Sequence, residues 1–222
     1  MPVNAAQIFR MLLDKLGPQG WWPGETPLEV MVGAVLVQNT AWANVKRAID
    51  NLRAADALDP RRLLALPLDE LEELIRPAGY FRVKAKRLGN LMRWFVVAYD
   101  GSIEALRQVD LPSLREELLG VNGIGPETAD SILLYALDKP TLVVDAYTLR
   151  IWARHGWIDY DTDYHRLQEH LSGELPADAT TFNEMHALIV EVGKKWCKPK
   201  PKCGDCPLAD LLPSGGIVEP CS

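Results

Sequence analysis

Four cysteines near the carboxyl end of the chain are residues whose spacing could do chemistry. They follow the pattern Cys197-x5-Cys203-x2-Cys206-x14-Cys221 and are the only cysteines among 222 residues. Thiols grouped at one end of an intracellular protein indicate metal ligation rather than disulfides. Zinc is the usual ion for four thiolates. The surrounding segment contains five prolines and little helical pattern, so we expect a bound metal to organise it.

A second chemical signal is the Gly-Ile-Gly-Pro sequence inside the segment 118–130, between two predicted helices. Its glycines permit a tight turn with positive φ, and Pro126 suits the first position of the next helix. Amides at the start of that helix can meet a phosphate, and the hairpin carbonyls could hold a monovalent cation beside it. An ordinary turn between helices is the alternative. The residues expected to shape the turn or meet the phosphate are Val121, Gly123, Ile124, Gly125 and Thr128.

Charge alone does not indicate a nucleic-acid partner, because the net charge is −6. Two local runs are basic, and each would suit a phosphate backbone or simply a solvated face. The runs are Arg82, Lys84, Lys86, Arg87 and Arg93, and then Lys194, Lys195, Lys198, Lys200 and Lys202.

The elements that must position these residues are helices, so the fold class is all-α. Asp178 is placed to cap the last helix and Gly193 to end it. The N-terminus has neither a signal-peptide pattern nor a membrane span, which leads us to expect a cytoplasmic protein. The periodicity predicts helices over 5–16, 27–38, 41–54, 68–75, 83–99, 113–119, 127–137, 146–155, 164–172 and 179–192.

The stretch 118–145 resembles the helix-hairpin-helix and Gly/Pro-rich loop of the endonuclease III superfamily of DNA glycosylases. The resemblance implies two helical lobes, one over 27–139 with the hairpin and one over 1–26 plus 140–222. It also implies a monomer acting on double-stranded DNA that carries a damaged base, in base excision repair and associated with the nucleoid. Such enzymes flip the target nucleotide out of the duplex before cutting its N-glycosidic bond.

Asp145 matches the aspartate that ends the family's loop at the mouth of its active site. A carboxylate there can stabilise a developing oxocarbenium ion and orient water, besides capping the helix that follows. Bifunctional relatives carry a lysine at the start of the second hairpin helix, where this chain has Glu127. Because a carboxylate cannot form an imine, we expect a monofunctional enzyme that uses water as its nucleophile.

The resemblance also changes the expected metal from zinc to a [4Fe–4S] cluster in the loop 194–222. Cys203 to Pro207 looks like the family's central ligand pair. The first cysteine gap is five residues rather than the usual six, and the last gap is much longer than usual. Cys221, the penultimate residue, is therefore the ligand that matches the family's pattern least well. A bound cluster would hold the lysines of 194–202 as a phosphate-binding edge.

The N-terminal half resembles the 3-methyladenine DNA glycosylases built on the endonuclease III scaffold. The expected base pocket consists of Trp21, Trp22, Pro23, Trp42 and Glu127. Indole faces attract a cationic alkylated purine by roughly 0.5–2 kcal/mol per contact, and the Glu127 carboxylate would add to that attraction.

Four further residues have DNA-binding roles by resemblance. Gln38 matches the side chain that fills the gap left by the extruded base. Tyr80 and Phe81 lie where the family places its wedge, and Lys84 could hold a phosphate. Two other functions stay open: a glycosylase for mismatched or oxidised pyrimidines, and a metal-bearing module that recognises damage without cutting.

Overall fold

The computed structural model describes residues 4–21 and 24–220, and in these residues it contains helices and no strands. The chain forms two compact units, one over 22–139 and one that joins 1–21 to 140–222. The predicted first boundary lies five residues later, after residue 26. None of the described helices is both long enough and apolar enough to cross a membrane.

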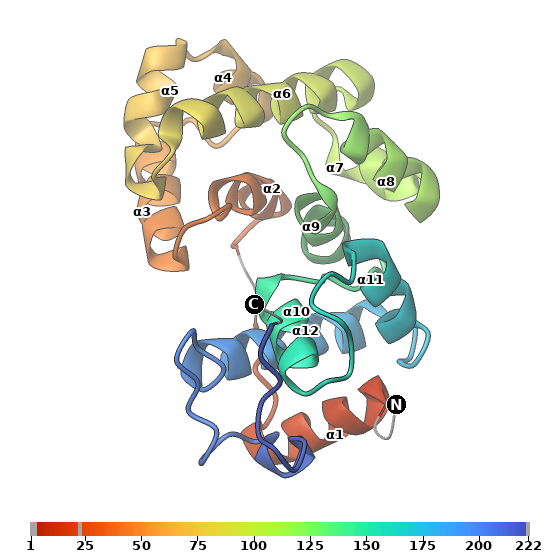
Figure 1. The fold of residues 1–222 in the computed structure, drawn as a ribbon. Coiled ribbons are helices and arrows are strands. Elements are labelled where there is room, and N and C mark those ends of the chain that lie inside the picture. Colours follow the sequence, from red (N-terminus) through yellow and green to blue (C-terminus); the bar gives the residue numbers. More distant parts are fainter. Residues whose placement is uncertain (1–3, 22–23, 221–222) are drawn as a thin grey trace. The chain divides into compact units, whose positions relative to one another are not determined.

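The unit over 22–139 is built around a helix that is apolar on nearly every side. This helix, α2 (Pro27–Leu36), buries every residue from Glu29 to Leu36, as expected for a helix surrounded by others. It contacts α3, α6 and α9, which enclose it in Figure 1. The other elements of this unit are α3 (Trp42–Ala54), α4 (Pro60–Ala65), α5 (Leu68–Leu74), the 3-10 turn η1 (Arg76–Ala78), α6 (Phe81–Tyr99), α7 (Ile103–Gln108), α8 (Leu111–Gly120), α9 (Pro126–Ser131) and the π-helical turn η2 (Ile132–Ala136).

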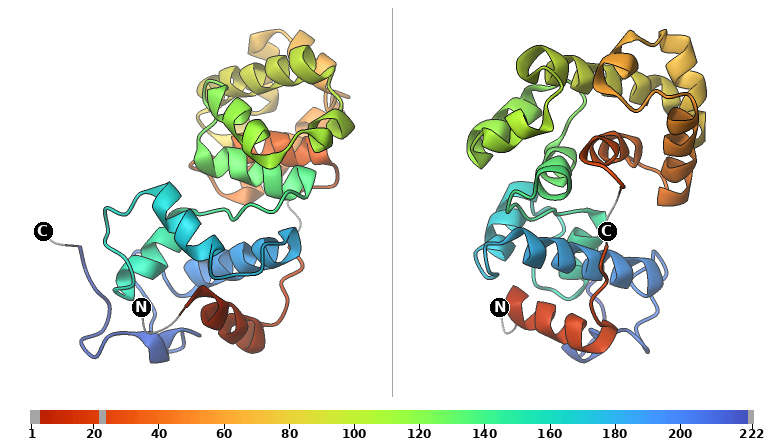
Figure 2. Two further views of the ribbon diagram at one scale, coloured as in Figure 1. Left: turned by 90° about the vertical axis from the view of Figure 1, so that its right-hand side faces the viewer. Right: turned by 180° about the vertical axis from the view of Figure 1, so that it is seen from behind.

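The second unit consists of α1 (Ala5–Leu16), α10 (Ala146–Arg154), α11 (Tyr164–Ser172), α12 (Ala179–Lys195) and the 3-10 turn η3 (Ala209–Leu211). Its centre is α12, which contacts both α10 and α1, and Figure 2 shows α1 running beside it. Asp178 caps α12 by accepting a hydrogen bond from the Thr181 amide, as the sequence predicts.

The prediction that Gly193 ends α12 is wrong, because the helix continues to Lys195. A β-carbon at Gly193 would lie 2.2 Å from Cδ1 of Tyr147 on α10. Gly193 is therefore required for the close approach of α10 and α12 rather than for a change of chain direction.

The carboxyl-terminal segment is held by side chains of α1 and α10. Lys15 donates a hydrogen bond from Nζ to the Pro207 carbonyl at 2.8 Å. Arg154 donates to the carbonyls of Lys198 and Pro199. The segment has little helix of its own, and these bonds from Lys15 and Arg154 give its backbone partners that a helix would otherwise supply.

Candidate active site and DNA interface

Asp145 is the N-cap of α10 and is 8% exposed. Its Oδ1 accepts two hydrogen bonds from Thr148, at 2.7 Å from the backbone amide and 2.8 Å from Oγ1. Its Oδ2 lies 3.6 Å from Nε2 of His186 on α12. One carboxylate oxygen is thus fixed by the helix start, and the other faces an imidazole.

The pKa of Asp145 lies below its ordinary value. Burial acts to raise this pKa, but the neighbouring His186 and the hydrogen bonds from Thr148 outweigh the burial. The side chain is therefore a carboxylate near neutral pH. A buried negative charge of this kind can stabilise positive charge that develops on a sugar ring.

Sequence reasoning missed His186. It occupies a buried position on α12, among the residues that also include Phe182 and Ile189. The centroid of its ring lies 5.4 Å from that of Trp21, with the rings tilted by 49°. The available signal was a histidine at a position where the 3.6-residue period requires an apolar side chain.

The hairpin joins α8 to α9, and the expected positive φ is found at Gly123 but not at Gly125, which caps α9 with φ of −94°. Gly123 has φ of 96°, and a β-carbon there would also lie 2.3 Å from Cγ of Arg87. Pro126 is the first residue of α9, and Glu127 lies exposed in its first turn. The side chains of Val121, Ile124 and Thr128 are buried, so contact with DNA at these three positions would be made by the backbone.

Two sets of polar contacts, both with residues of the same unit, fix the hairpin. Arg115 on α8 binds the fully buried Asp130 on α9 through two hydrogen bonds, at 2.8 and 3.0 Å. From the end of α2, Gln38 donates to Oγ1 of Thr128 at 2.9 Å and to the Gly123 carbonyl at 3.3 Å. Arg87 in turn donates to the Gln38 side chain. In the free protein Gln38 therefore supports the hairpin.

Lys84 does not present its charge to a phosphate, which corrects the prediction for this residue. It is 2% exposed, and its Nζ donates hydrogen bonds of 2.8 Å to the carbonyls of Leu36 and Ala78. Burial and, secondarily, the nearby Arg87 lower its pKa. The side chain ties the start of α6 to the end of α2 and to η1.

The two wedge candidates differ in exposure. Tyr80 is 73% exposed and has a left-handed backbone, with φ of 47°. Phe81 is half-buried, with the guanidinium groups of Arg76 and Arg82 over its ring at 4.7 and 5.6 Å from the centroid. Tyr80 is thus the side chain of the two that stands free to enter a base stack.

The expected base-pocket residues belong to different units of the chain. Trp21 belongs to the unit that contains Asp145, whereas Trp42 and Glu127 belong to the unit that contains the hairpin. Trp22 and Pro23 lie outside the described residues. Trp42 packs closely on α2, since a β-carbon at Gly33 would lie 3.0 Å from its Cη2.

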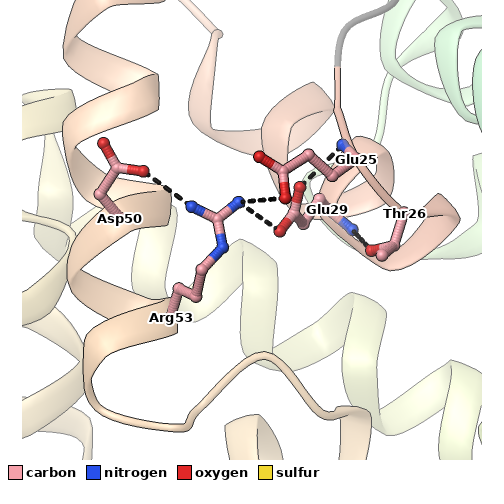
Figure 3. A network of polar contacts seen from close by, with 5 residues as sticks. All are labelled: Glu25, Thr26, Glu29, Asp50 and Arg53. Atoms are coloured by element: carbon pink, nitrogen blue, oxygen red, sulfur yellow. Dashed lines mark hydrogen bonds and ion pairs between the residues drawn. The ribbon is translucent and has the colours of Figure 1, made fainter.

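An ion-pair network around one buried carboxylate fixes the segment that follows Trp22 and Pro23 (Figure 3). Arg53 on α3 binds the buried Glu29 at 2.6 Å and also lies 3.4 Å from Glu25 and 2.9 Å from Asp50. Glu29 accepts a hydrogen bond from the Glu25 amide, and Thr26 caps α2. These bonds attach the start of α2 to the helix that begins with Trp42.

Three of the four cysteines, Cys197, Cys203 and Cys206, line one cavity together with Arg154, His155 and Trp196. Arg154 directs Nη1 to Sγ of Cys197 at 3.5 Å. Among residues 4–21 and 24–220 there is no group of three His, Cys, Asp or Glu side chains placed to hold a single metal ion. Cys221 lies outside the described residues.

The basic runs are largely on the surface. Arg82, Lys86 and Arg93 are exposed on α6. All five lysines of the second run, between 194 and 202, are exposed as well, although Lys195 is paired with Glu191. Apart from Lys84 and the half-buried Arg87, both runs can approach a phosphate backbone.

Comparison with known proteins identifies the family. A model of the HhH-GPD superfamily of base excision DNA repair proteins matches residues 32–177. A candidate DNA repair glycosylase of Methanocaldococcus jannaschii is 48% identical over 207 residues, which cover 92% of this chain and 94% of the relative. Endonuclease III of Thermotoga maritima is 32% identical over 181 residues, which cover 81% and 79% of the two chains.

Solved structures agree with the sequence comparison. The H. pylori 3-methyladenine DNA glycosylase bound to 1,N6-ethenoadenine has a TM-score of 0.75 at 30% identity, over 87% of this chain and 98% of its own. Endonuclease III trapped as a covalent intermediate with DNA has a TM-score of 0.80 at 26% identity, over 96% and 97% of the two chains. The resemblance and the all-α fold class are confirmed: this chain belongs to the HhH-GPD superfamily and is a base excision repair DNA glycosylase.

Proposed function

We propose that this glycosylase is monofunctional and excises alkylated purines such as 3-methyladenine by attack of water assisted by Asp145. The observation that carries the proposal is the state of Asp145, a buried carboxylate whose pKa is lowered and whose Oδ1 is fixed by Thr148. Such a group stabilises the cationic sugar as the base leaves. Glu127, at the first turn of α9, offers no amine for an imine.

The choice of alkylated purines rests on the charge of the leaving group and on one relative. A purine alkylated at N3 or N7 carries positive charge, which indole faces and a carboxylate attract. By the family resemblance, the candidates for these groups are Trp21, Trp22, Pro23, Trp42 and Glu127. The H. pylori neighbour is a 3-methyladenine glycosylase bound to a modified adenine, which supports the same substrate class here.

To keep the target nucleotide outside the duplex, the protein needs side chains that enter the base stack and groups that bind the DNA backbone. We assign the wedge to Tyr80, assisted by Phe81, and the phosphate contact to the hairpin backbone at Gly123 and Gly125, where a monovalent cation would also bind. Gln38 would fill the vacated space after releasing its bonds to the hairpin.

The experiment is a base-release assay on duplexes that contain 3-methyladenine, thymine glycol or a G·T mismatch, each analysed with and without alkali. We expect release from the alkylated purine, with strand breaks only after alkali. Breaks before alkali would contradict the monofunctional mechanism. Release from the pyrimidine substrates alone would contradict the choice of substrate, and no release from any duplex that is nevertheless bound would indicate recognition without cutting.

We also propose that Cys197, Cys203, Cys206 and Cys221 hold a [4Fe–4S] cluster. Three thiols around one cavity suit such a cluster, in which each thiolate binds a different iron. When bound, the cluster would tie the segment 197–221 together and fix the exposed lysines near it. Analysis of the purified protein should give iron and acid-labile sulfide, with absorbance at about 400 nm that Cys203→Ala abolishes. Zinc without sulfide would refute the cluster.

A further inference from the structure

His186 contacts the oxygen of Asp145 that Thr148 does not hold. Thr148 binds Oδ1 twice, whereas Nε2 of His186 lies 3.6 Å from Oδ2. This separation is just beyond a direct hydrogen bond, so the contact in the free protein is electrostatic. Contacts of this kind commonly tighten when the substrate binds.

The same imidazole also lies beside a tryptophan ring. The ring centroids of His186 and Trp21 are 5.4 Å apart and tilted by 49°. His186 is 6% exposed and belongs to α12, and Asp145 starts α10. The close approach of these two helices at Gly193 and Tyr147 therefore fixes the position of the imidazole relative to the carboxylate.

We propose that His186 is a positioning residue that connects the base-binding indole of Trp21 to the catalytic carboxylate of Asp145. The inference rests on the proposed function, because it assigns Trp21 to the base pocket and Asp145 to catalysis. An N–H on Nε2 of His186 can hold Oδ2 in place, so that the Asp145 carboxylate stays oriented for the oxocarbenium ion. The imidazole ring holds Trp21 at the same time.

Two substitutions separate these two tasks. His186→Phe keeps a ring beside Trp21 but removes the donor, and His186→Gln keeps a donor near the position of Nε2 but removes the ring. In single-turnover base release, the Phe variant should be about 10- to 100-fold slower, the usual effect of losing one hydrogen bond to a charged group. Its apparent affinity for the damaged duplex should change less than threefold.

The Gln variant should recover most of the rate and bind the damaged duplex more weakly. His170→Phe is the matched control, because His170 lies on α11 at the surface of the same unit and pairs only with Glu174 among the ion pairs of the described residues. If His186→Phe fails to fold, His186→Asn replaces it, since its amide reaches the position of Nδ1 rather than Nε2. A Phe or Asn variant with the wild-type rate would overturn the proposal.

A second measurement does not depend on which base is excised. The pKa of the Asp145 carboxyl can be followed by 13C NMR in protein labelled at aspartate, with the resonance identified by its loss in Asp145→Asn. We expect this pKa to rise in His186→Phe and to stay unchanged in His170→Phe. No rise would refute the coupling between His186 and Asp145. If the rise occurs but no alkylated purine is released by the wild type, the proposed substrate fails and the positioning role stands.

Discussion

Replacing Lys84 with methionine tests whether its buried ammonium stabilises the fold or binds DNA. Methionine fills a similar volume but cannot donate to the carbonyls of Leu36 and Ala78, which Nζ now reaches at 2.8 Å. Each buried carbonyl left without a donor costs about 1–3 kcal/mol. The folded state of the variant no longer has to desolvate an ammonium group, which offsets part of this loss. We therefore expect the free energy of unfolding to fall by about 2–4 kcal/mol.

The assay has two parts. Urea denaturation gives the free energy of unfolding, and binding to a duplex at several salt concentrations gives the slope of log K against log salt. If Lys84 is structural, Lys84→Met lowers stability and leaves the slope unchanged. Arg82→Met is the control, because this side chain on α6 is 80% exposed and its loss should change stability by less than about 0.5 kcal/mol. A stable Lys84→Met protein whose salt slope falls by about one would refute the reasoning, since that is the signature of a lost phosphate contact.

Three further predictions concern the proposed catalytic carboxylate of Asp145, the hairpin, and the contact of α10 with α12 at Gly193. Base release should persist from neutral pH to below the ordinary aspartate pKa of about 3.9, and it should fall only as the pH drops through the lowered pKa of Asp145. The stability that this carboxylate contributes should be complete above about pH 4 and should be lost over the same acidic range. A pH profile with an acidic limb at or above the ordinary value would contradict this, and Asp145→Asn should bind damaged duplex without releasing the base. Arg115→Met removes the two hydrogen bonds that Arg115 donates to the buried Asp130 carboxylate. It should lower the free energy of unfolding in urea by about 3–5 kcal/mol, whereas unchanged stability would show that the pair is dispensable. Gly193→Ala should lower the free energy of unfolding by about 1–3 kcal/mol because the new β-carbon overlaps Tyr147. The control Gly89→Ala on α6, where a β-carbon meets nothing within 4 Å, should be neutral or slightly stabilising. Equal effects of the two substitutions would contradict the packing explanation.

The helices that the sequence predicts best are those with clear caps at their starts. The predicted bounds of 5–16 and 164–172 match α1 and α11, because Asn4 and Asp163 provide N-caps and apolar residues recur on one face. Of the six-residue helices, α4 and α7 are not predicted, since they are too short for periodicity. Their caps, Asp59 and Ser102, were the available signals.

Long-range contacts account for the errors at single residues. A glycine after an apolar helix normally indicates a helix end, and only the position of Tyr147 shows that Gly193 serves packing. Lys84 lies in a basic run, and only the fold shows that its Nζ reaches two carbonyls. His186 lies 41 positions from Asp145 in sequence, so no local pattern could pair the two residues.

The hairpin is held by side chains from other parts of its own unit, whereas the hydrogen bonds that fix Asp145 come from Thr148 on its own helix. Gly123 must be glycine both for its φ of 96° and for the approach of Arg87 from α6. Gln38, at the end of α2, then binds the hairpin at Gly123 and Thr128. A functional site needs such support to keep its geometry. The Gly-Ile-Gly-Pro sequence moved by itself into another helix turn should therefore bind DNA poorly, because the residues that fix its backbone come from α2 and α6.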